Sequence, residues 1–219
     1  PKPMAPIDGR PFLEYQLDYW IGQGIDRFVL SVGYRREAVL AHFGRRYNGA
    51  RIDYAVEETP LGTGGALLLA AGQLDGDQAF LVLNGDTYFA VELAELVAFA
   101  DAHSADWCFA LFQPAESGRY MGMDLSPEGR VIALKSGSAQ PGRPANGGVY
   151  WMRAEALRDC GFAPGAPCSL EDDLAPAAMN AGQRLFGREF SGPFIDIGVP
   201  GDYRRAAAVL AAAAAQEPK

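Results

Sequence analysis

The sequence predicts an α/β fold in which a mixed, mostly parallel sheet is covered by helices. Three observations support this fold class. Segments with apolar residues at helical spacing alternate with short apolar runs along the first half of the chain. The short runs are apolar on both faces, which is typical of parallel strands buried between helices. After residue 121 the alternation gives way to a hairpin pattern, which indicates antiparallel strands in the second half.

The first half alternates helices and strands in chain order. In segment 12–24 the apolar positions recur at helical spacing and a glycine ends the run, which predicts a helix. The run AFLVL at 79–83 is the clearest candidate for a buried parallel strand, because every residue in it is apolar. By the same criteria we expect further helices at 35–43, 66–74 and 91–103, and further strands at 27–32, 52–56 and 107–112.

The second half adds a hairpin, single strands and two helices. Ser169 is the expected cap of a helix at 170–181, with Glu171 in its first turn, where a carboxylate suits the helix dipole. A closing helix is expected at 202–215, which ends in an alanine-rich run. No linker interrupts the chain, so we expect one domain over residues 1–219. We expect hairpin strands at 122–125 and 131–134, a loop at 136–144, a strand at 148–152 and a last strand from Phe194.

Composition excludes several classes of function. The chain has 219 residues, with 19 Lys and Arg against 27 Asp and Glu, so its formal net charge is −8. This acidic balance argues against nucleic-acid binding, which needs clustered basic residues. No run of about 18 apolar residues indicates a membrane span, and we expect no signal peptide. With only two histidines, His-based triads and His-rich metal sites are not expected. Cys108, Cys160 and Cys168 have no metal-like spacing, so we expect reduced thiols in a cytoplasmic protein.

Two aspartates follow short apolar strands that are far apart in the sequence. Asp86 comes after the 79–83 run, and Asp196 follows Phe194 and Ile195. Ligands of open parallel sheets bind at the carboxyl ends of strands. Two carboxylates meeting there suit Mg²⁺, which takes one or two protein carboxylates and completes its shell with water and phosphate oxygens. An equally good interpretation is that Asp86 starts a turn and Asp196 pairs with an arginine.

The segment Leu61-Gly62-Thr63-Gly64-Gly65 joins an expected strand to an expected helix. Its glycines allow close backbone approach, and a helix N-terminus offers free N–H groups to an anion or a base edge. The segment is neither a Walker A loop nor a dinucleotide fingerprint, because no Gly-Lys-Ser/Thr follows and the glycine spacing differs. A tight strand-to-helix turn with only a structural role is the alternative.

The remaining polar candidates are ambiguous when taken singly. Lys2, between two prolines, is a stiffly held cation or a solvated terminal lysine. Lys135 ends a strand and fits a cleft and solvent equally well. Asn146 and Gly147 precede a strand and suit either sugar hydroxyls or a plain turn. Glu171 opens an acidic run that is usually a solvated first turn of a helix.

Five segments, taken together and in order, resemble the sugar-1-phosphate nucleotidyltransferase family. They span nearly the whole chain, and five ordered matches are far more specific than any one of them. The segments are Pro1-Lys2-Pro3-Met4, Glu57-Glu58-Thr59-Pro60-Leu61-Gly62-Thr63-Gly64-Gly65-Ala66, Asn84-Gly85-Asp86-Thr87-Tyr88-Phe89, Asn146-Gly147-Gly148-Val149-Tyr150, and Phe194-Ile195-Asp196-Ile197-Gly198-Val199-Pro200-Gly201-Asp202-Tyr203.

The resemblance implies a nucleotide-diphospho-sugar transferase fold. This is a Rossmann-like sheet whose first half (1–112) binds the nucleotide and whose second half (113–219) binds the sugar phosphate. The implied reaction is attack by an oxygen of a sugar 1-phosphate on the α-phosphorus of a nucleoside triphosphate, with release of pyrophosphate. Positioning and charge neutralisation supply most of the catalysis in such a reaction.

The resemblance also implies a role for each matching residue. Lys2, Asp86 and Asp196 are the implied catalytic residues, with Lys2 stabilising charge at the phosphates and the two aspartates holding Mg²⁺. The other implied contacts are Glu58, Leu61, Gly62, Thr63, Gly64 and Asp86 for the nucleotide, and Lys135, Asn146, Gly147 and Glu171 for the sugar phosphate.

Within the family, three of the segments most resemble the guanylyltransferases that act on D-glycero-D-manno-heptose 1-phosphate. This implies GTP and that heptose phosphate as substrates, and a GDP-heptose for surface polysaccharides as the product. The alternatives are a uridylyl- or other nucleotidyltransferase acting on a hexose or aminosugar 1-phosphate, a non-catalytic relative that binds a nucleotide sugar, and an unrelated Rossmann-like module. Family members commonly associate as homo-oligomers, and no nucleic-acid or membrane partner is expected.

The sequence departs from the family pattern in two places. The family's glycine-rich triphosphate loop and first strand lie just upstream of the Pro-Lys-Pro segment, whereas this chain begins at Pro1. Either further residues precede Pro1, or the chain is a truncated relative that cannot hold the triphosphate. We expect the former, with a strand followed by Gly-Gly-x-Gly-Thr-Arg upstream. The family also often carries Glu-Lys after the hairpin, and Leu134-Lys135 lacks that glutamate, which leaves the role of Lys135 open.

Overall fold

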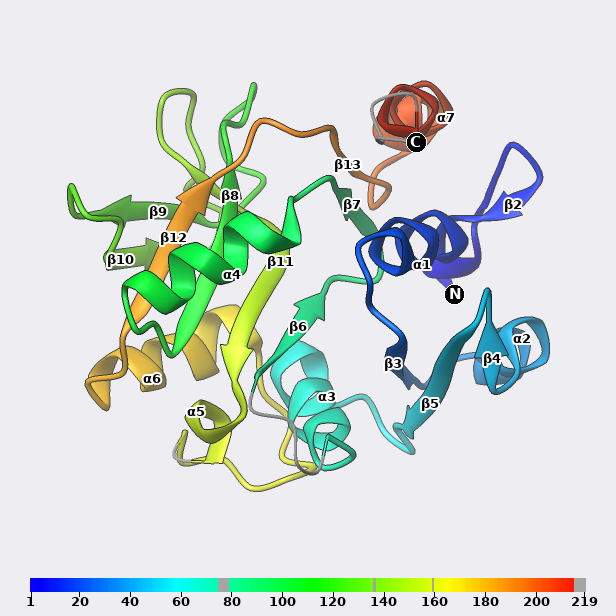
Figure 1. Ribbon diagram of the computed structural model, residues 1–219, viewed down its shortest axis with the longest axis horizontal. Coiled ribbons are helices and arrows are strands. Elements are labelled where there is room, and N and C mark those ends of the chain that lie inside the picture. The colour runs from blue at the N-terminus through cyan, green and yellow to red at the C-terminus, as the bar shows by residue number, and fades with distance from the viewer. Residues whose placement is uncertain (75–78, 136, 159, 215–219) are drawn as a thin grey trace. The chain divides into compact units, whose positions relative to one another are not determined.

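The computed structural model describes residues 1–74, 79–135, 137–158 and 160–214 (Figure 1). Its helices and mixed sheets confirm the expected α/β class. Contacts divide the chain into two compact units. Unit 1 comprises Pro1–Val56, Asn84–Ala90 and the chain from Gly192 onward, and unit 2 comprises Glu57–Leu83 and Val91–Ser191. That the two units form one domain stays a prediction.

Unit 1, in its described residues, contains two short sheets, a hairpin and three α-helices. In the first sheet β3 and β5 are parallel along their length, from Arg27 opposite Arg51 to Val32 opposite Val56, and β4 pairs antiparallel with β5. The elements of unit 1 are η1 (Lys2–Met4), β1 (Pro6–Ile7), β2 (Arg10–Pro11), α1 (Phe12–Gly22), β3 (Arg27–Val32), α2 (Arg36–Phe43), β4 (Arg46–Tyr47), β5 (Ala50–Val56), β7 (Thr87–Phe89), β13 (Phe194–Asp196) and α7 (Pro200–Ala214).

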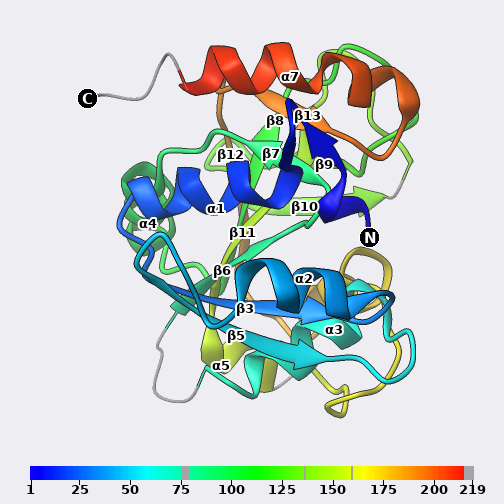
Figure 2. The same cartoon turned by 90° about the vertical axis from the view of Figure 1, so that its right-hand side faces the viewer.

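The second sheet of unit 1 joins two segments that are about a hundred residues apart in the chain. Strands β7 and β13 are antiparallel, with Asp196 opposite Thr87, and α7 packs against β13 (Figure 2). The pairing extends past the strand ends, because the Ile197 N–H donates to the Asp86 carbonyl over 2.9 Å. On α1, the buried Gln16 amide donates to the carbonyls of Asn84 and Thr87, so the turn before β7 is also fixed from the helix.

Unit 2, in the residues that the structure describes, contains one larger mixed sheet. Its strand order is β10-β9-β11-β8-β12, and β6 pairs with β11. Only β8 and β12 are parallel among the pairs of this sheet in the described residues. The elements are α3 (Gly62–Ala71), β6 (Ala79–Leu83), α4 (Leu93–Ala102), β8 (Trp107–Phe112), β9 (Gly122–Leu125), β10 (Val131–Lys135), β11 (Ala145–Arg153), α5 (Ala154–Arg158), the π-helix η2 (Leu170–Leu174), α6 (Ala175–Asn180) and β12 (Leu185–Glu189).

The core of unit 2 forms around β8 and β11. Every residue of β8 is buried, and α4 lies across β8, β11 and β12 (Figure 1). Each fully buried large side chain contributes about 1.5–3 kcal/mol to folding, before the cost in conformational entropy. The largest members of this core are Trp107, Phe109, Leu111, Met123, Tyr150, Met152 and Leu170.

The sheets differ from the expectation in two ways. Among the described residues, antiparallel strand pairs outnumber parallel ones. AFLVL at 79–83 is a strand that pairs antiparallel with β11 and is only half-buried along its length. An apolar run alone does not report the direction of the partner strand. The strand at Leu185–Glu189 was not expected, because Gly187 and two charged residues break its apolar pattern, although β8 holds it in parallel register.

Helix boundaries also differ from the expectation. The helix expected at 66–74 begins earlier, at Gly62, so the glycine segment is its first turn. The helix expected at 170–181 opens as a π-turn, and its Ser169 cap is confirmed, since the Ser169 hydroxyl accepts from the Asp172 N–H. The closing helix is Pro200–Ala214, and Ala215 lies outside the described residues.

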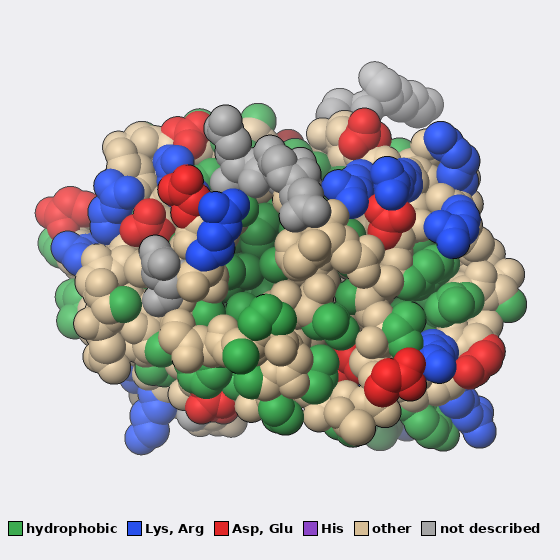
Figure 3. Space-filling view, turned by 90° about the horizontal axis from the view of Figure 1, so that it is seen from below, with side chains coloured by type: hydrophobic (Ala, Val, Ile, Leu, Met, Phe, Trp, Pro, Cys, Tyr) green, Lys and Arg blue, Asp and Glu red, His purple; other side chains and the backbone are tan. Residues whose placement is uncertain are grey.

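No helix among the described residues is long and apolar enough to cross a membrane. On the face in Figure 3, hydrophobic side chains are interspersed with charged ones. Large side chains that are both hydrophobic and exposed are scattered along the described chain. Leu40 lies on α2, Val56 on β5 and Ile132 on β10, whereas Tyr34 and Val199 lie between elements.

Gly192 tests how closely the ends of β7 and β13 must approach. A Cβ on Gly192 would overlap the carbonyl oxygen of Ala90. The N–H of Ala90 in turn donates to the carbonyl of Pro193, which holds the two segments together. We expect Gly192→Ala to lower the free energy of unfolding by about 1–3 kcal/mol, measured by urea denaturation. Gly201→Ala is the control, because a Cβ on Gly201 meets no atom within 4 Å. Equal urea midpoints for the two variants would show that the strand ends tolerate a side chain at Gly192.

Candidate functional site

Unit 1 brings Lys2, Asp86 and Asp196 together. The Lys2 ammonium lies 3.2 Å from Oδ2 of Asp86, and the two side chains are 64% and 34% exposed, so the cluster is open to solvent. The Gly198 N–H donates to Oδ1 of Asp196 over 2.7 Å. A Cβ placed on Gly198 would lie 2.8 Å from that oxygen and 3.7 Å from Lys2 Nζ, so Asp196 and Lys2 flank the same glycine.

Strand pairing and a close approach at a glycine explain this convergence. The β7–β13 ladder sets Asp86 beside the residues that follow Asp196. A Cβ on Gly85 would lie 3.2 Å from the Pro3 ring, so a glycine here lets the segment that carries Lys2 lie close to the Asp86 turn. Three segments that are distant in the sequence thus supply two carboxylates and one ammonium group to one surface.

The donor set of this cluster fits Mg²⁺. In the described part of the chain, no group of three or more His, Cys, Asp or Glu side chains is arranged to hold a metal. A cation at Asp86 and Asp196 therefore has to complete its shell with water and ligand oxygens, as Mg²⁺ does in phosphate-binding sites. Structural zinc sites use four Cys or His ligands, which this cluster does not offer.

The segment that carries Lys2 is anchored by backbone carbonyls. The Phe12 N–H donates to the carbonyl of Ala5 over 3.0 Å. The Tyr15 hydroxyl donates to Ile7 over 3.0 Å, and the Tyr203 hydroxyl of α7 donates to Pro6 over 2.6 Å. Helices α1 and α7 thus hold the β1–β2 hairpin and, through it, the position of Lys2.

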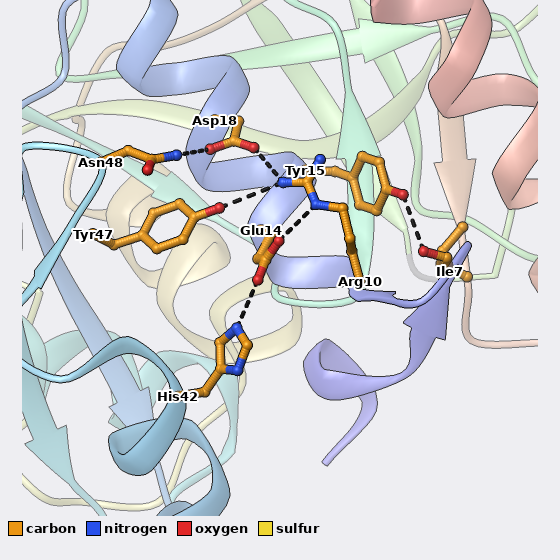
Figure 4. Close-up of polar contacts among 8 residues, drawn as sticks. All are labelled: Ile7, Arg10, Glu14, Tyr15, Asp18, His42, Tyr47 and Asn48. Carbon is orange, nitrogen blue, oxygen red and sulfur yellow. Dashed lines mark hydrogen bonds and ion pairs between the residues drawn. The ribbon is translucent and has the colours of Figure 1, made fainter.

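Arg10 on this hairpin is the centre of a polar network (Figure 4). Its guanidinium donates to Glu14 over 2.7 Å and to Asp18 over 2.5 Å, and it also contacts the Tyr47 hydroxyl. His42 of α2 bonds the other oxygen of Glu14 over 2.6 Å. The hydrogen bond with Asp18, followed by that with Glu14, raises the pKa of Arg10 above its ordinary value. Burial raises the pKa of Glu14, but the hydrogen bonds with Arg10 and His42 lower it by more, so its pKa lies below the ordinary value.

Unit 2 holds the glycine segment against residues 166–169. A Cβ on Gly62 would lie 2.6 Å from the Cys168 carbonyl oxygen, and Gly62 has a φ of +71°, so this position favours glycine twice over. The N–H groups of Gly64 and Gly65 donate to that same oxygen over 2.9 and 3.2 Å. The Leu61 N–H donates to Glu57 over 3.1 Å. The expectation that the N-terminus of this helix offers free N–H groups is therefore wrong for these three residues.

The sugar candidates Asn146 and Glu171 also meet in unit 2. The Asn146 amide donates to the Tyr150 hydroxyl over 2.6 Å, and that hydroxyl donates to Oε1 of Glu171 over 3.0 Å. The Thr63 hydroxyl donates to Oε2 of Glu171 over 3.0 Å. The glycine segment and the sugar candidates are thus one hydrogen-bonded network.

The other predicted residues of unit 2 are less closely tied to this network. Gly147 follows Asn146 on β11 and is buried. Lys135 ends β10 opposite Gly122, which in turn pairs with Ala145. Its side chain is exposed, and no hydrogen bond or ion pair between it and Asn146 or Glu171 is found among the described residues. Glu58 is likewise exposed. The predicted residues therefore form two groups, Lys2–Asp86–Asp196 in unit 1 and Thr63–Asn146–Glu171 in unit 2.

Three residues that organise these groups were not predicted from the sequence. Glu57 fixes the start of the glycine segment, Tyr150 links Asn146 to Glu171, and Arg10 holds the hairpin. Glu57 and Tyr150 both lie within the matching segments, which is the signal that marked them. Arg10 had no such signal, because it lies outside the matching segments and bonds two residues of α1 and one of β4.

Comparisons with known proteins agree with the family that the sequence motifs resemble. Residues 1–213 match the family described as Nucleotidyl transferase. The chain is 38% identical over 206 residues to D-glycero-alpha-D-manno-heptose 1-phosphate guanylyltransferase of Aneurinibacillus thermoaerophilus, covering 94% of this chain and 87% of that protein. It is 35% identical to the protein of the same name from Campylobacter jejuni, covering 93% of this chain and 87% of that protein.

A solved structure agrees in fold. The crystal structure of HddC from Yersinia pseudotuberculosis complexed with GMP-PN superposes with a TM-score of 0.81 at 26% sequence identity. The match covers 95% of this chain and 89% of that chain. It is a nucleotide complex of a protein with this fold.

The low pKa of Glu14 predicts an acid-dependent loss of stability. A carboxylate whose pKa is lower in the folded state stabilises the protein above its ordinary pKa of about 4.3, and this contribution disappears as the pH falls through the folded-state value. We expect Glu14→Gln to lower the free energy of unfolding by about 1–2 kcal/mol at pH 7 and to flatten its decline as the pH falls below the ordinary glutamate pKa of about 4.3, measured by urea denaturation.

Glu95→Gln is the control for this prediction. Glu95 forms an exposed ion pair with Arg188 within unit 2, and its loss should change stability by less than about 0.5 kcal/mol. A pH profile for Glu14→Gln as steep as that of the unmodified protein would contradict the role given to the Arg10 network.

Proposed function

The chain belongs to the nucleotidyl transferase family, and we propose that it transfers a guanylyl group from GTP to D-glycero-D-manno-heptose 1-phosphate. The products are a GDP-heptose and pyrophosphate, and the GDP-heptose serves surface polysaccharide synthesis. Two relatives that cover nearly all of the chain carry the corresponding name, and the HddC structure is complexed with GMP-PN. Cytoplasmic location and association into homo-oligomers stay predictions.

The observation that carries this proposal is the cluster of Lys2, Asp86 and Asp196. The two substrates together bring several phosphate charges to one place, and a chain with a net charge of −8 needs local cations there. Lys2 supplies one fixed positive charge beside Asp86. The two aspartates are the residues that would hold Mg²⁺, which when bound offsets the charge on the phosphates.

The reaction is an in-line displacement at phosphorus. A phosphate oxygen of the sugar 1-phosphate attacks the α-phosphorus of GTP and forms a new P–O bond. The bond between the α-phosphorus and the oxygen that bridges to the β-phosphate breaks, and pyrophosphate leaves with that oxygen. The chain's contribution is to position the phosphates and to neutralise charge through Lys2, so no side chain has to act as a nucleophile.

We assign the substrate contacts to the residues for which the family resemblance implies them. In unit 2 we assign Glu58, Leu61, Gly62, Thr63 and Gly64 to the nucleotide. In unit 1 we assign Asp86 to it. Asn146, Gly147 and Glu171 contact the sugar hydroxyls, and Lys135 is assigned to the sugar phosphate. The support for Glu171 is strongest, because the hydroxyl groups of Tyr150, Thr63 and Ser169 already donate to its carboxylate.

Removal of either aspartate tests the catalytic assignment. In the full-length protein supplied with Mg²⁺, GTP and heptose 1-phosphate, we expect Asp86→Asn and Asp196→Asn each to lower pyrophosphate release by at least about 100-fold. Asp26→Asn, an exposed aspartate of the same unit, is the matched control and should retain full activity. Undiminished turnover in either site variant refutes the assignment.

A substrate panel tests the choice of base and sugar. We expect GTP with the heptose phosphate to give a higher kcat/KM than UTP or CTP, and than GTP with mannose 1-phosphate or glucose 1-phosphate. A strict preference for UTP contradicts the guanylyl assignment. Binding of a nucleotide sugar without turnover of any pair identifies a non-catalytic relative instead.

A further inference from the structure

The carboxylate of Glu171 is held from two elements at once. Its Oε1 accepts from the hydroxyl of Tyr150 on β11, and its Oε2 accepts from the hydroxyl of Thr63 on α3, each over 3.0 Å. Glu171 itself lies in the first turn of η2, after the Ser169 cap, whose hydroxyl is 3.4 Å from Oε2. Its position is therefore set by a strand, a helix and a capped turn that are separate in the sequence.

The direction of each hydrogen bond is fixed by a donor behind it. The Gly148 N–H donates to Oδ1 of Asn146, which leaves the amide nitrogen of Asn146 to donate to the Tyr150 oxygen. Tyr150 then has its own hydrogen for Glu171. In the same way the Leu170 N–H donates to the Thr63 oxygen over 2.8 Å, so the Thr63 hydrogen goes to Glu171. Both chains of hydrogen bonds end on the carboxylate.

Packing fixes the tyrosine. The Tyr150 side chain is fully buried, and its ring makes an edge contact with Phe109 at a centroid distance of 5.3 Å. Asn146 is 8% exposed. Inside a low-dielectric core such a chain of satisfied hydrogen bonds is rigid, because each broken bond leaves a buried polar group unpaired.

We propose that Tyr150 and Thr63 are positioning residues for the sugar site. They orient the Glu171 carboxylate so that each of its oxygens, already held by a hydroxyl of the protein, accepts one further hydrogen bond from a sugar hydroxyl. The ligand class is a sugar that presents two neighbouring hydroxyls as donors. This inference rests on the proposed function, since it takes Glu171 as the acceptor of those hydroxyls.

Thr63 adds a connection to the nucleotide. It lies between Gly62 and Gly64, in the segment assigned to the nucleotide, while its hydroxyl bonds both η2 and Glu171. When GTP orders this segment, it also orders the Thr63 hydroxyl that donates to Glu171. The two substrates therefore bind with positive coupling, and the KM for the sugar 1-phosphate falls as GTP approaches saturation.

Steady-state kinetics of full-length variants test the proposal. We expect Tyr150→Phe to raise the KM for the sugar 1-phosphate about tenfold, with the KM for GTP changed less than about twofold, because the ring packing stays and one hydrogen bond is lost. We expect Thr63→Val to raise both KM values and to abolish the coupling between them. Thr63→Ser, which restores the hydroxyl, should recover most of this loss.

Substrate analogues separate positioning from a general packing defect. The sugar 1-phosphate is tested with one hydroxyl removed at a time. If Tyr150 orients Glu171, removing a sugar hydroxyl that donates to Glu171 raises the KM by a smaller factor in Tyr150→Phe than in the unmodified enzyme. Removing any other hydroxyl raises the KM by the same factor in both. A packing defect raises the KM of every analogue by the same factor, and that result overturns the proposal.

Controls keep the outcomes distinct. Tyr54→Phe removes a tyrosine hydroxyl that donates to the Gly44 carbonyl in unit 1 and should leave both KM values unchanged. Should Tyr150→Phe fail to fold by circular dichroism, Thr63→Val at its exposed position decides the question. If the unmodified enzyme is active and the folded Tyr150 and Thr63 variants have the same KM values as it does, the positioning role is overturned and the proposed function is not. Absence of turnover in the unmodified enzyme counts against the proposed function instead.

Discussion

The pairing of β7 with β13 is the constraint on which the candidate catalytic site depends. It joins residues that follow Leu83 to residues near the end of the chain, and its last hydrogen bond, from Ile197 to the Asp86 carbonyl, lies beside both aspartates. Gln16 satisfies two carbonyls of the turn before β7, and Phe89 packs edge-on against Phe194. Loss of this ladder would separate the two carboxylates, whatever else of the fold remained.

Both groups of site residues are held by hydrogen bonds whose donors are themselves fixed. In unit 1 the hairpin that follows Lys2 is tied by Tyr15, Tyr203 and the Arg10 network. In unit 2 the carboxylate of Glu171 is tied by Tyr150 and Thr63. Such arrangements reduce the reorganisation needed when charged substrates arrive, which is the main contribution a protein makes to phosphoryl and nucleotidyl transfer.

Local patterns in the sequence predicted most elements, and motif order predicted the family. The strand at 27–32 and the segments around Asp86 and Asp196 are where the sequence placed them. The direction of AFLVL was wrong, because an apolar run carries no information on which edge its partner occupies. The N–H groups of Gly64 and Gly65 were expected to be free, but Cys168, about a hundred residues away in the chain, accepts from both. Tertiary packing sets contacts of this kind, so no local pattern in the sequence predicts them. For the same reason the sequence marked Tyr150 only as part of a motif and not as a partner of Glu171.

Catalysis by the proposed route requires that Asp86 and Asp196 share one divalent cation next to Lys2. Electron paramagnetic resonance of Mn²⁺, added to the full-length protein with a non-hydrolysable GTP analogue, measures this without turnover. We expect one bound Mn²⁺ per chain that is lost in Asp86→Asn and in Asp196→Asn, with the nucleotide-binding fold intact by circular dichroism. Mn²⁺ binding as tight in either variant as in the unmodified protein would contradict a shared cation.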